Sequence, residues 1–222
     1  CYTHRDKFIM AAWEPPMPNL FERMQHLRGT ENLFMDFAYG DARVIKLRDM
    51  LMEYYLTQME KWCKTPIDSI HIADDWGSQR SLLISPDMWR EYFKPAYKQF
   101  CDMARDYGKF IVMHSDGYIV DIIPDMIDLG IHAVNSQLFC MPIEELAEKF
   151  HYKICFWGEI DRQHIQVYGT PDEMRAAVRR VAGAFLPYGR TGFLAQCYYT
   201  MNVPEANKEA EFDEWNRISN GL

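Results

Sequence analysis

The segment Phe110–Gly117 combines an apolar run with residues that can bind metal, because it ends in a histidine and an aspartate. Side chains alternate along a strand, so His114 and Asp116 are expected on one face. Cys197 follows a second short apolar run, Gly192–Gln196. Imidazole, carboxylate and thiolate are all zinc ligands, and three protein ligands with one open position are typical of a catalytic site. If the two strand ends converge, the sequence predicts a metal at His114, Asp116 and Cys197.

Each of these three residues also has an alternative interpretation. His114 could be a buried or substrate-binding histidine, and Asp116 could orient the imidazole from behind without touching a metal. Cys197 could be a small residue packed in the core. As a metal ligand it would be a thiolate, since the ion stabilises the anion.

Three further carboxylates follow predicted strands. Asp74 and Asp75 are adjacent, so only one of them can face a common pocket, and the other is expected to have a structural role. For this pair we predict substrate binding by Asp74 and proton transfer by Asp75. Glu159 shares a strand face with Trp157 and is predicted to be a general acid or a fourth metal ligand. The alternative for Glu159 is an ion pair with a neighbouring arginine.

Several polar and aromatic residues near these strand ends are predicted to bind a small-molecule substrate. The amides can hydrogen-bond the substrate, and the aromatic rings can line an apolar pocket; packing within the loops is the alternative. The residues are Trp76, Asn135, Gln137 and Tyr198.

The composition excludes several classes of protein. The chain has 222 residues, of which 48% are hydrophobic, which is enough to form a single large core. Its formal charge of -8 and the lack of a lysine and arginine cluster argue against nucleic-acid binding and anionic membrane binding. No apolar run reaches transmembrane length. Six cysteines without a C-x-x-C pair suggest reduced thiols, and therefore a cytoplasmic protein.

Short apolar runs alternate with helical patterns along the chain. Because the runs are apolar throughout, they are typical of strands in a parallel sheet that is covered on both faces. Helices are expected to begin after Asp41, at Ser85-Pro86 and at the capping box that starts with Thr170, and Pro95 is expected to split the second one. A final helix is expected over Pro204–Ile218. The predicted strands are Phe8–Trp13, Ser69–Ala73, Phe110–His114, Ala133–Asn135, Ile154–Trp157 and Phe193–Gln196.

Repeated strand–helix units indicate either a doubly wound sheet or a (β/α)8 barrel. Polar residues follow five successive predicted strands, and barrel enzymes carry their chemistry at the carboxyl ends of the strands, which favours the barrel. Six strands are fewer than eight, and the chain begins with Cys1. We therefore expect residues 1–222 to be a single barrel domain whose N-terminal part is missing.

At these strand ends the chain resembles the uroporphyrinogen decarboxylase superfamily, which includes the decarboxylase and the cobalamin-dependent methyltransferases. The resemblance runs in order from about Phe8 to the C-terminus and implies a (β/α)8 barrel. It is carried by Asp74–Gly77, Ile84–Trp89, Phe93–Pro95, His114–Gly117, Ile122–Pro124, Leu129–Gly130, Gly158–Asp161 and Gly169–Glu173.

The methyltransferase branch of this superfamily implies a zinc site and a corrinoid (cobalamin) partner protein. Its zinc-dependent members carry a His-x-Cys on the fifth strand and a Cys on the last, and they transfer methyl between a thiol and a corrinoid. His114 and Cys197 match the outer two positions, and Asp116 replaces the middle cysteine. A carboxylate makes the site harder and less suited to a thiolate, which leaves methyl ethers and methylamines as substrates.

The decarboxylase branch implies a different activity, in porphyrin biosynthesis and without a metal. Its last strand resembles Gly-His-Gly, whereas this chain has Gln196–Tyr198. A third alternative is a corrinoid- or tetrapyrrole-binding protein without catalysis. From the resemblance we favour metal-dependent methyl transfer involving a corrinoid protein.

Overall fold

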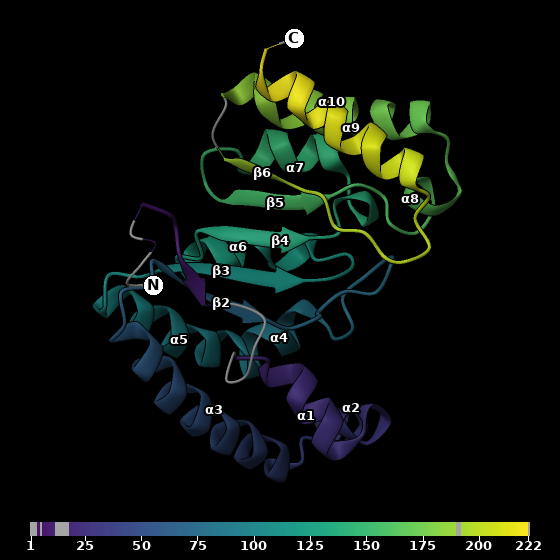
Figure 1. Ribbon diagram of the computed structural model, residues 1–222. Helices are drawn as coiled ribbons and strands as arrows, with labels where there is room; N and C mark the ends of the chain where they lie inside the picture. The colour runs from purple at the N-terminus through teal and green to yellow at the C-terminus, as the bar shows by residue number, and fades with distance from the viewer. Residues whose placement is uncertain (1–3, 5, 12–17, 190–191, 222) are drawn as a thin grey trace.

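The computed structural model describes residues 4, 6–11, 18–189 and 192–221, and these residues contain one six-stranded parallel sheet. The strands pair strictly in chain order, from β1 to β6, with every pair parallel. The helices surround the outside of the sheet, which is part of a TIM barrel (Figure 1). The strands are β1 Met10–Ala11, β2 Ser69–Ala73, β3 Phe110–Ser115, β4 Ala133–Ser136, β5 Cys155–Glu159 and β6 Phe193–Gln196.

Each strand is followed by helical structure, as the alternating pattern predicts. The α-helices are α1 Leu20–Arg28, α2 Thr30–Ala38, α3 Ala42–Cys63, α4 Pro86–Tyr92, α5 Lys94–Asp106, α6 Ile123–Asp128, α7 Ile143–Phe150, α8 Ile165–Tyr168, α9 Pro171–Phe185 and α10 Glu205–Ser219. Short 3-10 turns lie at η1 Val120–Ile122, η2 Leu138–Cys140 and η3 Leu186–Tyr188.

The predicted helix signals are confirmed where the sequence gives a cap. The Asp41 side chain accepts from the amide of Arg43 at the start of α3, and Ser85 accepts from Met88 at the start of α4. Thr170 forms the expected capping box at the start of α9. The helix is interrupted between α4 and α5, just before Pro95, because proline has no amide hydrogen to donate to the preceding turn.

Two predictions differ from the structure near the N-terminus. Strand β1 is only Met10–Ala11, and the end of the predicted strand Phe8–Trp13 lies outside the described residues. Helices α1 and α2 were not predicted, although Leu20, Phe21 and Met24 pack in the core at helical spacing. The pattern is short and interrupted by Gly29, which explains why it does not stand out in the sequence.

The register of the strands places the predicted site residues in layers. His114 on β3 is opposite Asn135 on β4, and Asn135 is opposite Trp157 on β5. In a parallel sheet, opposite residues point to the same face, so these three side chains form one layer inside the half-barrel. Glu159 and Gln196 are opposite one another two residues further along, in the next layer toward the carboxyl ends.

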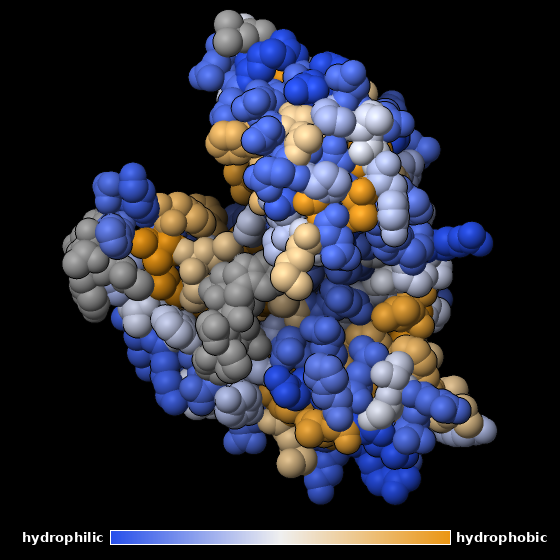
Figure 2. Space-filling model, turned by 45° about the vertical axis from the view of Figure 1, so that its right-hand side comes forward, coloured by the Kyte–Doolittle hydropathy of each residue, from blue (hydrophilic) through white to orange (hydrophobic). Residues whose placement is uncertain are grey.

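On the face shown in Figure 2, apolar residues (orange) lie in several separate groups among polar residues (blue). Within the described part of the chain, no helix is both long enough and apolar enough to cross a bilayer.

Candidate functional site

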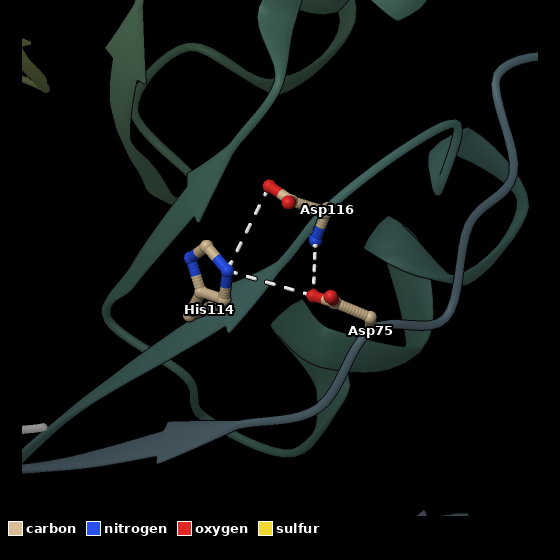
Figure 3. A group of neighbouring side chains, drawn as sticks. All are labelled: Asp75, His114 and Asp116. Atoms are coloured by element: carbon tan, nitrogen blue, oxygen red, sulfur yellow. Dashed lines mark hydrogen bonds and ion pairs between the residues drawn. The ribbon is translucent and has the colours of Figure 1, made fainter. Parts of the chain in front are cut away.

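Three side chains at the carboxyl ends of β2 and β3 form a candidate metal site. One ligand atom from each of Asp75, His114 and Asp116 can be chosen so that all three lie within 4.8 Å of one another. The Nε2 atom of His114 lies 3.5 Å from Asp75 Oδ1 and 3.7 Å from Asp116 Oδ1. Figure 3 shows the imidazole directing one ring nitrogen toward both carboxylates. The arrangement offers one nitrogen and two carboxylate oxygens to a single cation.

The two aspartates are brought together by close packing of two loops. The amide of Gly77 donates to the carbonyl of Asp116 at 3.1 Å, and the amide of Asp116 donates to Asp75 Oδ1 at 2.9 Å. Gly117 has a φ of +78°, and a Cβ on it would lie 2.2 Å from the carbonyl oxygen of Gly77. Only glycine fits this contact, so Gly77 and Gly117 together set the distance between the two loops that carry the carboxylates.

The charges of this group stabilise one another. Burial opposes a positive charge on His114, but hydrogen bonds to Asp75 and Asn135 and the charge of Asp116 outweigh it and raise the pKa of the imidazole. Burial likewise opposes ionisation of Asp75, yet its hydrogen bonds with His114 and the Asp116 amide keep its pKa below the usual value. A protonated His114 therefore pairs with both carboxylates, and a divalent cation would take the place of the imidazole proton.

Arg162 connects the metal group to the predicted acid Glu159. Its guanidinium donates to Asp116 Oδ2 and lies 3.1 Å from Glu159 Oε1. Glu159 is buried, and this burial raises its pKa to about 7 despite the nearby arginine. A pairing of Glu159 with a neighbouring arginine was the alternative expected from the sequence, and the structure shows that pairing. Arg162 itself was not predicted to be a site residue, although it follows Glu159 by three positions.

The cluster opens into a cavity of about 380 Å³ at the mouth of the half-barrel. Carboxyl ends of barrel strands are where enzymes of this architecture bind their substrates. Trp157 and Tyr198 supply aromatic surface to the cavity, and the remaining walls are polar. The lining residues are His114, Asp116, Asn135, Ser136, Trp157, Glu159, Arg162, Gln196 and Tyr198.

The structure does not bring Cys197 to the metal group, and Asp75 takes the third position instead. Gln196, the last residue of β6, faces the cavity and accepts a hydrogen bond from Asn135. Because side chains alternate along a strand, Cys197 points the other way. There its thiol interacts with Tyr199 and with Glu211 on α10, and burial raises the pKa of the thiol. The sequence predicted Cys197 as the ligand at the end of this strand, but the side chain that faces the cavity there is that of Gln196.

Two predicted substrate-binding residues have structural roles. Asp74 is fully buried, and its carboxylate accepts from the backbone amides of Phe21 and Glu22 at 3.0 and 2.9 Å and from the Tyr97 hydroxyl. It thereby holds the first turn of α1 against the end of β2. Trp76 is also fully buried, and its ring stacks on Phe21 at 4.3 Å between ring centroids. As expected for adjacent aspartates, only Asp75 faces the site.

The other predicted substrate-binding residues surround the cavity. Asn135 and Tyr198 line it directly, and the side chain of Tyr198 is half exposed. Gln137 is buried beside it, where its Oε1 atom accepts from the amide of Gly117 at 2.9 Å and supports the loop that carries Asp116. For Gln137, the alternative of loop packing describes what the structure shows.

Comparison with known proteins gives the fold and the family. A methyltransferase from Methanosarcina mazei superposes with a TM-score of 0.72 at 17% identity, covering 91% of this chain and 58% of that one. The 7,8-dihydropteroate synthase from Vibrio fischeri ES114 superposes with a TM-score of 0.50 at 13% identity, covering 77% of this chain and 65% of that one. The chain thus spans less than two thirds of each of these structures.

The sequence comparisons identify a family but no individual relative. No curated protein matches this chain. The family model described as "Uroporphyrinogen decarboxylase (URO-D)" matches residues 21–210, which include every member of the metal group and every lining residue of the cavity. The resemblance inferred from the strand-end motifs is therefore confirmed, and the chain belongs to the uroporphyrinogen decarboxylase family.

Proposed function

We propose that this protein is a metal-dependent methyltransferase that moves a methyl group between a small substrate and a corrinoid protein. The observation that carries this proposal is the convergence of Asp75, His114 and Asp116 at the edge of a substrate-sized cavity. The fold of a methyltransferase from Methanosarcina mazei supports the assignment. Zinc is our proposed metal, because a nitrogen and two carboxylate oxygens, with a position left open, fit a catalytic zinc site.

The ligand set also indicates the substrate. Without Cys197 the site has no sulfur ligand, and oxygen-rich sites suit harder donor atoms than thiolate. A methyl ether or a methylated amine therefore fits this site better than a thiol. When bound, the metal would act as a Lewis acid toward the heteroatom that carries the methyl group.

The residues around the cavity can perform the remaining tasks of such a reaction. Glu159 lies in the cavity wall with a pKa of about 7, so near neutrality it can hold a proton for the departing heteroatom. Arg162 holds Asp116 from the side away from His114. Trp157 and Tyr198 provide apolar surface for the body of the substrate.

Decarboxylation of a porphyrinogen is the alternative that shares this family. A porphyrinogen carries many carboxylates and requires a cationic pocket. The described walls of this cavity contain Arg162 as the cationic partner of two acidic residues, Asp116 and Glu159. This balance of charge favours a small neutral substrate over a polyanion.

The proposal is tested by a corrinoid methylation assay on the zinc-loaded protein. Reduced cobalamin is mixed with a panel of methyl ethers and methylamines, and methylcobalamin is followed by its absorbance. Methylation that His114→Ala abolishes and Cys197→Ser preserves would support the proposal. Decarboxylation of uroporphyrinogen by the same preparation, with no methylation of cobalamin, would refute it.

A further inference from the structure

The orientation of the Asn135 side chain is fixed by a backbone carbonyl. Its Nδ2 atom donates to the carbonyl oxygen of Trp157 at 2.9 Å and to Oε1 of Gln196. A carbonyl oxygen can only accept, so the amino group of Asn135 must face Trp157. The Oδ1 atom of Asn135 therefore faces the other way, toward His114.

This orientation decides which imidazole nitrogen of His114 is left to bind a cation. Asn135 Oδ1 lies 2.7 Å from His114 Nδ1, and an amide oxygen can only accept. The Nδ1 atom is consequently the protonated nitrogen that donates to Asn135. The Nε2 atom faces the carboxylates of Asp75 and Asp116, which also only accept, so its lone pair is available when a cation takes the place of its proton. This is the nitrogen that Figure 3 shows directed at Asp75 and Asp116.

We propose that Asn135 is a positioning residue that makes Nε2 of His114 the metal-binding nitrogen. The inference rests on the proposed function and deepens it, because it explains how a buried histidine is prepared for a cation. Histidines that bind metals commonly donate their second N–H to an oxygen that fixes ring and tautomer. Here that oxygen belongs to an amide on the neighbouring strand, placed directly opposite His114 by the register.

Gln196 supports the Asn135 side chain from the side opposite His114. Its Oε1 atom takes the second N–H of Asn135, so the chain of hydrogen bonds crosses from β6 through β4 to β3. The Trp157 carbonyl remains when the Gln196 side chain is removed. The structure thus predicts a graded effect, large for Asn135 and small for Gln196.

The protonation of the ring is measured first, on zinc-loaded protein labelled with 15N-histidine. Protonated and unprotonated ring nitrogens differ widely in 15N chemical shift, and the signal absent from His114→Gln identifies His114. We expect protonated Nδ1 in the wild type and in Asn135→Asp, which keeps an acceptor oxygen. We expect loss of this preference in Asn135→Leu. Zinc bound through Nδ1 in the wild type, or an unchanged spectrum in Asn135→Leu, would overturn the inference.

Zinc affinity is measured next, by calorimetry on the same proteins, with circular dichroism as the check on folding. Asn135→Leu is expected to lose about 10- to 100-fold in zinc affinity, the range seen when such supporting partners are removed. Asn135→Asp should restore wild-type affinity, and Gln196→Leu should change it less than threefold, on the order of one weak hydrogen bond. Equal affinity of Asn135→Leu and wild type would contradict the inference. A wild type that binds no zinc would instead refute the proposed function, whereas zinc bound through Nδ1 would refute only the inference.

Discussion

Replacing Gly117 with alanine should both destabilise the protein and disturb the metal group. Gly117 has a positive φ, which costs a residue with a Cβ about 1–2 kcal/mol. The added Cβ would also lie 2.2 Å from the Gly77 oxygen, so the two loops must separate. The separation breaks the hydrogen bonds from Gly77 to Asp116 and from Tyr118 to Ser78. At about 1 kcal/mol each, these two hydrogen bonds and the backbone term add to a loss of about 3–4 kcal/mol.

Gly130→Ala is a matched control for this experiment. Gly130 has a φ of +81°, nearly the same as Gly117, but a Cβ there would have nothing within 4 Å. It should cost only the backbone term of about 1–2 kcal/mol and leave zinc affinity unchanged. Urea unfolding gives both free energies, and calorimetry gives the affinities. Equal destabilisation by the two variants, or normal zinc binding by Gly117→Ala, would show that the glycine contact does not set the distance between the aspartates.

Three further predictions concern buried carboxyl groups. Burial raises the pKa of Glu211 to about 8, so the folded state keeps a proton that the unfolded state releases near pH 4.5. The contribution of Glu211 to the free energy of unfolding should therefore be greatest below about pH 4.5, be lost as pH rises through about 8, and amount to about 5 kcal/mol at most. In urea unfolding at several pH values, Glu211→Gln should remove this part of the pH dependence, and an unchanged pH dependence would refute the assignment. Asp74→Ala leaves two helix amides and the Tyr97 hydroxyl without their acceptor and should cost roughly 3 kcal/mol or more, whereas the exposed Asp128→Ala should cost less than about 0.5. Glu159→Gln should lower the rate of methyl transfer while zinc affinity stays at the wild-type value, and a normal rate would remove Glu159 from the reaction.

Much of the fold could be predicted from local signals in the sequence. The capping residues Asp41, Ser85 and Thr170 bind their own helices, so their effect is readable within a few positions. Polar residues after successive apolar strands indicated the barrel, because the carboxyl ends of parallel strands meet on one side. Helices α1 and α2 are held by contacts with distant elements, such as Phe21 on Trp76, and this information is not local.

Of the three residues in the metal group, the sequence predicted as ligands only the two that lie close together in one segment. His114 lies near the end of β3 and Asp116 directly follows that strand, and both were identified by alternation within this one segment. Asp75 was predicted to be catalytic rather than a ligand, since its distance from His114 depends on the packing of two glycines from separate loops. Cys197 was placed in the metal group because the sequence does not reveal where β6 ends relative to the cavity. Gln196, the residue directly before Cys197, lines the cavity instead.

The most direct test of this account is the metal content and zinc affinity of the purified protein, compared with Asp75→Asn, His114→Ala and Cys197→Ser. The account predicts about one zinc ion per chain, bound by the wild type and by Cys197→Ser alike. Asp75→Asn and His114→Ala should lose most of the affinity while remaining folded. No zinc bound by the wild type, or zinc lost from Cys197→Ser and kept by Asp75→Asn, would contradict it.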